Sequence, residues 1–255
     1  MALVSTLPVL NLLAMSFFKI TWQDARAVWE ANGVGHYRDL ANDNLVRASL
    51  RNTVFFAVVS VLLQVVIGFT LALFVSKITR GRTLYRMVFL LPLLIPGIVI
   101  GAIWKLIFNS EFGLLNQILE VFGVWPVDWL GEEKIALWSV IIVDIWHWTP
   151  FCFLLLLAGI ESLPQDIYEQ AKIDGASGWQ ELMRITLPLM WPAIVVTFVF
   201  RFITAFKVFD EVYLLTAGGP GTATEVLSFT IYQRFFTENR PGFGAAMSIA
   251  VIFLI

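Results

Sequence analysis

Residues 161–191 read ESLPQDIYEQAKIDGASGWQELMRITLPLMW and form a polar interruption between two long apolar runs. These 31 residues hold seven charged side chains, whereas the runs on either side hold almost none. Gly175 and Gly178 break the stretch into two short helical patterns. The chain is therefore expected to consist of apolar segments, with a helical hairpin where this stretch divides them.

Local sequence rules define the expected hairpin. Pro164 suits the start of a helix, and residues 165–173 then follow as a short amphipathic helix. Gly175 lies in the turn, because glycine tolerates backbone angles that other residues avoid. Ser177 can cap a second short helix that runs to Thr186. On this pattern alone the stretch is either an ordinary solvated loop or a hairpin that docks on a partner.

The composition indicates a polytopic membrane protein. Hydrophobic residues make up 58% of the 255 residues, charged residues only 14%, and the mean hydropathy is +0.80. Soluble proteins average about 25% charged residues. The net charge of -2 and the lack of any basic run give no sign of a nucleic-acid partner. The lipid bilayer is thus the first partner that the sequence predicts.

Five apolar runs are expected to cross the bilayer and a sixth begins to, since a hydrocarbon core about 30 Å thick needs roughly 20 apolar residues per helix. The sixth run is too short to cross, so we expect the sequence to stop inside that helix. The expected fold is an all-α polytopic bundle with one domain over 1–255. The six spans are 1–18, 52–76, 87–108, 135–160, 192–209 and 242–255.

The distribution of basic residues predicts the sidedness of the bundle. One basic residue, Lys134, lies in residues 109–134, whereas four follow the second span with no acid among them. Basic loops stay in the cytoplasm, so the second span ends there and residues 109–134 lie outside. By alternation the 161–191 hairpin and the N-terminus are cytoplasmic. The four basic residues are Lys77, Arg80, Arg82 and Arg86.

Two further segments carry local predictions. Residues 19–51 are rich in charge and are expected to form a hydrophilic loop. Pro92, Pro96 and Gly97 lie inside the third span, where proline removes a helical hydrogen bond and bends the axis. A static kink is favoured there over a moving hinge.

Polar and ionisable side chains recur on single faces of three spans, where they are costly. One interpretation is a substrate path through the bundle. The other is hydrogen bonding between helices that fixes the packing, with Asp144 and His147 paired to neutralise each other. The residues concerned are Gln64, Asp144, His147, Thr197, Arg201 and Thr204.

The sequence gives no catalytic, nucleotide or metal site. There is no G-x-x-x-x-G-K-[ST] motif, so the chain cannot bind ATP through a P-loop of its own. Two histidines and one cysteine offer no metal site of the usual spacing. Catalysis within the chain is therefore not expected.

The hairpin carries a motif that changes its interpretation. The pattern Glu169-x-Ala171-x-x-Asp174-Gly175-Ala176, followed by Ile185-x-Leu187-Pro188, resembles the cytoplasmic EAA signature of binding-protein-dependent ABC import permeases. Gln170 departs from it, since the family usually has alanine there. The resemblance implies that these eight residues couple the chain to a separate ATPase subunit.

The resemblance extends over nearly the whole chain. The segments FLLPLLIPG, FGLLN, DWLG and VFDEVYLLTAGGPGTATE look like the first, maltose-type permease of sugar importers. The last of them contains the outer motif Gly218, Gly219 and Pro220. The fold implied is the six-helix bundle of a type I importer, in the inner membrane of a prokaryote.

This resemblance also implies the assembly. ATP and Mg would be bound by two ATP-binding subunits or one homodimeric ATPase, so the chain itself needs no cofactor. A second homologous permease and an extracytoplasmic solute-binding protein complete it, and a sugar crosses by alternating access. Two alternatives stay open: another cargo, such as a polyol, glycerol phosphate, amino acid or polyamine, or a self-sufficient secondary carrier driven through Asp144, His147 and Arg201.

Overall fold

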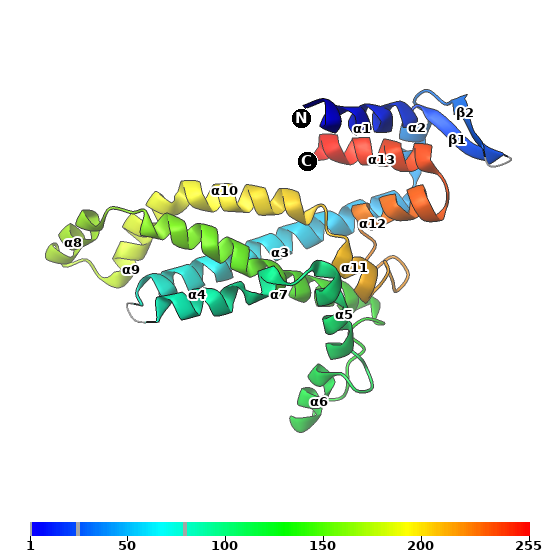
Figure 1. The fold of residues 1–255 in the computed structure, drawn as a ribbon. Helices are drawn as coiled ribbons and strands as arrows, with labels where there is room; N and C mark the ends of the chain where they lie inside the picture. The colour runs from blue at the N-terminus through cyan, green and yellow to red at the C-terminus, as the bar shows by residue number, and fades with distance from the viewer. Residues whose placement is uncertain (1, 24–25, 79–80) are drawn as a thin grey trace.

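The computed structural model describes residues 2–23, 26–78 and 81–255, so Met1 and Arg80 of the sequence predictions lie outside the described residues. Three helical segments within the described residues are long and apolar enough to cross a membrane. They are α3 (Asn44–Ser76), α7 (Glu133–Glu161) and the continuous run Gly178–Ala205. They lie side by side and form the body of the molecule (Figure 1). The predicted helical polytopic bundle is confirmed.

The third predicted span is a pair of helices that meet at 92°. The segment α4 (Arg82–Leu90) continues into the short 3-10 turn η1 (Leu91–Leu94), and α5 (Gly97–Ile107) then leaves in a new direction. Pro92 and Pro96 have no N–H group to donate, so two successive turns lose helical hydrogen bonds. The sequence predicts a static kink here, and the structure has a sharp break.

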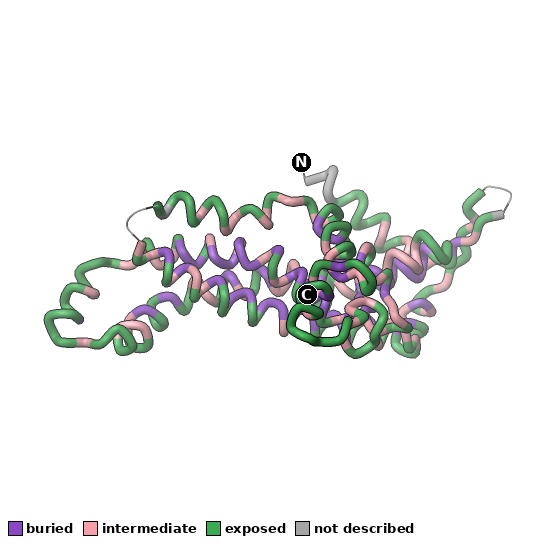
Figure 2. Tube along the Cα trace, turned by 90° about the horizontal axis from the view of Figure 1, so that it is seen from below, coloured by how far each residue is buried: buried purple, intermediate pink, exposed green. Residues whose placement is uncertain are grey.

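Close backbone approach holds α3 against α7. A Cβ built on Gly68 of α3 would lie 2.9 Å from both the Cys152 Cβ and the Phe153 backbone nitrogen of α7. Large side chains on both sides, including Phe56 and Leu156, are fully buried. Buried residues accordingly follow the axis of the bundle, while its outer faces are exposed (Figure 2).

The segment predicted as a hydrophilic loop, 19–51, is instead structured. Strands β1 (Phe18–Gln23) and β2 (Arg26–Ala31) pair antiparallel, followed by helix α2 (Gly35–Asn42). Helix α3 begins eight residues before the predicted span, because the Asp43 carboxylate accepts hydrogen bonds from the first N–H groups of α3. The two strands, FKITWQ and RAVWEA, combine aromatic and β-branched residues with a few charged ones, a composition that suits an exposed hairpin.

The remaining elements frame the bundle. Helix α6 (Leu114–Val121) projects from α5, and α11 (Asp210–Leu215) packs on α5. Helices α1 (Ala2–Met15) and α13 (Pro241–Leu254) lie side by side (Figure 1). Both are apolar over Thr6–Met15 and Pro241–Leu254, but these stretches are shorter than the three spanning helices. Six membrane crossings therefore remain a prediction. Between α11 and α13 lie α12 (Leu227–Tyr232) and the π-helical turn η3 (Gln233–Thr237).

The second half of the hairpin and the fifth predicted span form one continuous helix. Helix α8 (Gln165–Ile173) has the predicted bounds, but the next helix does not end at Thr186. Instead α9 (Gly178–Glu181), the π-helical turn η2 (Leu182–Thr186) and α10 (Leu187–Ala205) run together without a break. The hairpin is therefore directly continuous with a membrane helix.

Candidate functional site

A buried ion pair joins the three long helices. Nη2 of Arg201 on α10 lies 2.6 Å and 2.7 Å from the two carboxylate oxygens of Asp144 on α7. Nε2 of Gln64 on α3 donates to Asp144 Oδ2 at 2.7 Å and to the Asp144 carbonyl at 2.9 Å. All three residues are at most 1% exposed. Three of the predicted polar residues thus form one network.

Thr204 and Thr197 differ in their relation to this network. Thr204 Oγ1 accepts a hydrogen bond from Arg201 Nη1 at 3.1 Å. Thr197 is buried, but its hydroxyl donates to the Ala193 carbonyl of its own helix. Arg201 Nε has no hydrogen-bond partner among the described residues. The Nε–H of Arg201 is therefore buried without a hydrogen bond to the described part of the chain.

The predicted pairing of Asp144 with His147 is wrong. His147 Nδ1 lies 3.0 Å from Oε1 of Glu211 on α11, and both side chains are buried. His147 lies three positions after Asp144 on α7 and faces α11, whereas Asp144 faces α3 and α10. Sequence reasoning missed Glu211, since its only signal was an acid just after the fifth span.

A cavity of about 400 Å³ lies beside these two pairs. Trp148 contributes an aromatic wall, and the Arg201 guanidinium carbon lies 4.7 Å from the centre of its ring. The other lining residues include both acids of α11. The full lining is Gly97, Asp144, His147, Trp148, Arg201, Thr204, Lys207, Val208, Phe209, Asp210 and Glu211. This arrangement offers both hydrogen-bond donors and acceptors next to an aromatic face.

Gly97 and Gly101 have no side chains and so allow α5 to pack closely against α11 beside this cavity. A Cβ on Gly97 would lie 2.8 Å from Asp210 Oδ2, and one on Gly101 would lie 2.8 Å from the Leu214 side chain. The bend after Pro96 therefore delivers α5 onto the helix that carries Glu211.

The hairpin turn follows from its local sequence. Gly175 has φ of +76°, and Ala176 N–H donates to the Ala171 carbonyl at 2.9 Å, which closes α8 as a Schellman motif. Ser177 and Gln180 then form a capping box at the start of α9, with the Ser177 N–H donating to Gln180 Oε1 at 2.8 Å. The predicted turn and cap are both confirmed.

The predicted signature residues differ in exposure. Ala171 is buried, at 6% exposed, and is the only buried residue of α8. Ile185 and Ala176 are half-buried. The exposed members are Glu169, Asp174, Gly175, Leu187 and Pro188. Most of the signature thus faces away from the chain itself.

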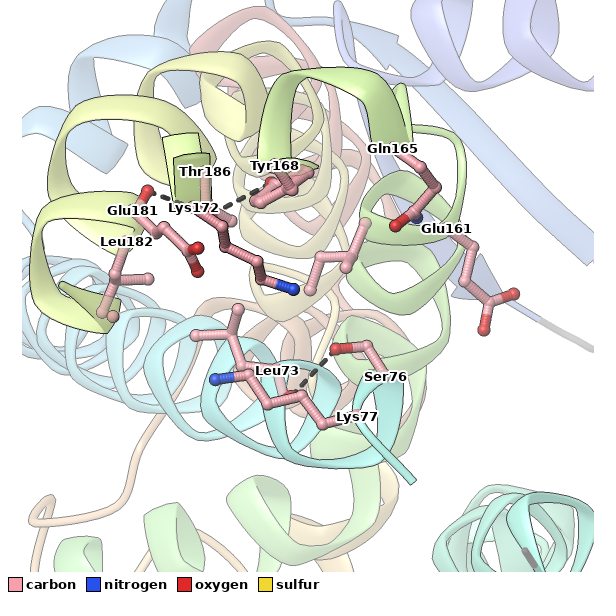
Figure 3. Close-up of a pocket in the computed structure, with 12 residues that line it drawn as sticks. Leu73, Ser76, Lys77, Glu161, Gln165, Tyr168, Lys172, Glu181, Leu182 and Thr186 are labelled. Carbon is pink, nitrogen blue, oxygen red and sulfur yellow. Dashed lines mark hydrogen bonds between the residues drawn. The ribbon is translucent and has the colours of Figure 1, made fainter. Parts of the chain in front are cut away.

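A polar pocket of about 450 Å³ separates the hairpin from the ends of α3 and α7 (Figure 3). Lys77 and Lys172 project into it from opposite sides, from α3 and α8. Tyr168 Oη and Thr186 Oγ1 lie 3.0 Å apart at its edge. Close by, the Arg86 guanidinium of α4 pairs with Glu161 at the end of α7.

The segment with Gly218, Gly219 and Pro220 is tied to α3. Asn52 Nδ2 donates to the carbonyls of Thr222 and Glu225 at 2.8 Å and 3.0 Å. Thr224 Oγ1 donates to the Gly219 carbonyl at 2.7 Å.

The Glu225 side chain is buried at the same place. Burial raises the pKa of its carboxyl above the ordinary range, and a hydrogen bond from Thr230 opposes the rise. Within the described residues, no group of three or more potential metal ligands occurs.

Comparison with known proteins identifies the family to which the chain is similar. The model of the family "Binding-protein-dependent transport system inner membrane component" matches residues 40–255. The trehalose/maltose transport system permease protein MalF of Thermococcus litoralis is 42% identical over 203 residues, which cover 80% of this chain and 68% of that protein. The probable starch degradation products permease AmyD of Thermoanaerobacterium thermosulfurigenes is 33% identical and covers 88% of this chain and 75% of its own length.

Solved structures agree in fold. A chain of a bacterial alginate ABC transporter, crystallised with an alginate pentasaccharide-bound periplasmic protein, superposes with a TM-score of 0.80 at 26% identity. The match covers 87% of this chain and 78% of that one. The chain therefore belongs to the family of binding-protein-dependent transport system inner membrane components, the permease subunits of ABC transporters.

Proposed function

We propose that this chain is the membrane subunit of an ATP-driven importer that moves a sugar across the inner membrane by alternating access. The sugar class is supported by relatives named for trehalose, maltose and starch products, and by the fold shared with an alginate transporter. In such a cycle two conformations exchange and bound ligands bias the balance. A polyol, glycerol phosphate or other small solute is the alternative cargo.

The 161–191 hairpin is the proposed docking point for the ATPase subunits, which bind ATP and Mg. One observation carries this assignment: Ile173 and Trp179, next to the turn, are 84% and 66% exposed although both are apolar. Exposed apolar patches rimmed by polar residues mark contact surfaces. Docking here is consistent with a cytoplasmic hairpin and a cytoplasmic N-terminus.

The cavity beside Asp144 and Arg201 is the proposed part of the substrate path. Sugar hydroxyl groups can donate hydrogen bonds to the carboxylates of Asp210 and Glu211 on the cavity lining. Carbon faces of a sugar ring can stack on Trp148. A second permease would complete the path, and a binding protein would deliver the sugar at the opposite end from the hairpin.

Reconstitution tests the proposal. We expect proteoliposomes with both permeases, the ATPase and the binding protein to accumulate labelled maltose or trehalose only with ATP, and this chain alone to transport nothing. Transport by the chain alone without ATP would identify a secondary carrier instead. The ligand that stabilises the purified binding protein on heating would identify the cargo.

Within the active system, Arg201→Ala is expected to reduce uptake more than assembly. The matched control is Thr197→Val, whose hydroxyl bonds only its own helix. Unchanged uptake in the Arg201 variant would return this residue to a purely structural role.

A further inference from the structure

Helix α8 is held to the rest of the chain by very little. Ala171 is its only buried residue. In the part of the chain that the structure describes, a single side-chain hydrogen bond joins α8 to another element, between Tyr168 Oη and Thr186 Oγ1 (Figure 3). A force applied to α8 therefore reaches α7 through the short connection 162–164, and it reaches α10 through the turn at Gly175 and through this bond.

The direction of the hydrogen bonds follows from their partners. Thr186 Oγ1 also lies 3.2 Å from the Glu181 carbonyl, which can only accept. A threonine hydroxyl has one proton, so Thr186 donates to Glu181 and Tyr168 donates to Thr186. The three groups form a chain from α8 into the start of the next helix. Thr186 is 5% exposed, so water competes little for these bonds.

This chain of bonds ends on an irregular part of the helix. Glu181 and Thr186 flank and close the π-helical turn η2. Such turns break the regular pattern of α-helical hydrogen bonds. Pro188 and Pro192 follow within six residues and have no N–H group to donate. The bond from Tyr168 therefore meets the helix where its own hydrogen bonding is weakest.

Space for movement exists beside the bond. The pocket of about 450 Å³ lies between α8 and the ends of α3 and α7, with Tyr168 and Thr186 on its lining. Its lining is largely polar, and Lys77 and Lys172 reach into it without an ion pair in the described part of the chain. A shift of α8 toward α3 would therefore enter open volume, where the apolar lining residues Leu73, Ile160 and Leu182 are only half-buried.

We propose that Tyr168 and Thr186 are positioning residues that transmit movement of α8 to α10 through the π-helical turn. This inference rests on the proposed docking of an ATPase on the hairpin. Closure of the ATPase displaces α8, the Tyr168 hydroxyl moves Thr186 with it, and the turn η2 converts the shift into a tilt of α10. The far part of α10 carries Arg201, which lines the cavity.

Substitution of the two hydroxyls tests this inference in the complete reconstituted transporter. Tyr168→Phe and Thr186→Val each remove one bond of the chain, and each is expected to raise the ATP hydrolysed per sugar transported about fivefold, as loss of one net hydrogen bond implies. Thr186→Ser keeps the hydroxyl and should couple normally. The double variant should be no worse than Thr186→Val.

Tyr85→Phe is the matched control, because Tyr85 makes no hydrogen bond through its hydroxyl among the described residues and lies on α4. Normal coupling by Tyr168→Phe would overturn the inference, whether or not Thr186→Val assembles. A defect in Thr186→Val alone would assign the effect to the π-helical turn and also overturn it. If the unmodified chain bound no ATPase, the proposed function itself would fail, and that result is distinct from these.

Discussion

Removal of the Asp144 carboxylate tests the buried network most severely. In Asp144→Ala the Arg201 guanidinium, only 1% exposed, loses its counter-ion, and Gln64 loses one of its two acceptors, keeping the backbone carbonyl of residue 144. Breaking a buried pair by removing one partner destabilises by about 3–5 kcal/mol. For a chain of this size, 1 kcal/mol shifts the unfolding midpoint by roughly 2–4 °C, so a fall of roughly 6–20 °C is expected.

Removal of the other partner, Arg201, should lower the unfolding midpoint less than removal of Asp144. In Arg201→Ala, Asp144 keeps the hydrogen bonds from Gln64, and a carboxyl group can bind a proton and become neutral. A guanidinium has no such option, because arginine stays charged in proteins. The double variant, which leaves no unpaired charge, should unfold at a higher temperature than Asp144→Ala.

The assay is the thermal midpoint of the detergent-solubilised chain, measured at one heating rate because unfolding of membrane proteins is commonly irreversible. Thr197→Val is a suitable control, since it alters a buried hydroxyl of α10 outside the network. Midpoints within about 3 °C of the unmodified chain for Asp144→Ala would refute the reasoning. So would a double variant less stable than either single variant.

Three further outcomes are expected. Gly175→Leu should weaken binding of the ATPase or raise ATP use without transport, because φ of +76° strains any other residue by about 1 kcal/mol or more. Co-purification measures the binding of the ATPase to this variant. Normal assembly with normal uptake would count against a coupling role for the hairpin. Gly68→Leu should prevent a stable fold, because the new side chain would overlap the backbone beside Cys152, and a monodisperse elution profile would contradict this. The raised pKa of Glu225 implies stability that is present below the ordinary carboxyl pKa of about 4.3 and lost as pH rises through the folded value. The midpoint of Glu225→Gln should therefore gain on the unmodified chain as pH rises, and a constant difference would be evidence against this sign.

Local features of this chain were predictable from sequence. The bounds of α8, the turn at Gly175 and the cap at Ser177 follow from rules that involve neighbouring residues only. Burial of Gln64, Asp144 and Arg201 was likewise foreseeable from their place inside apolar runs.

Features that depend on residues far apart in the chain could not be predicted from the sequence. His147 pairs with Glu211, 64 positions away, and nothing in the spacing of α7 indicates which helix His147 faces. The right-angle break after Pro96 depends on the packing of α5 against α11, which holds the two halves apart. The charges of residues 19–51 predict a loop, whereas the strands and α2 form there from aromatic and β-branched residues dispersed among those charges.

The continuous helix Gly178–Ala205 has the dimensions of a lever. At 1.5 Å per residue, the 19 residues of α10 extend about 28 Å beyond the turn η2. A tilt of about 10° around that turn would move the far end by about 5 Å by this geometry. The bonds of 2.6–2.7 Å from Arg201 to Asp144 cannot stretch so far, so α7 must swing with α10. In the proposed cycle the path would then open at the surface that α3, α7 and α10 together present to neighbouring helices, and not between these three helices.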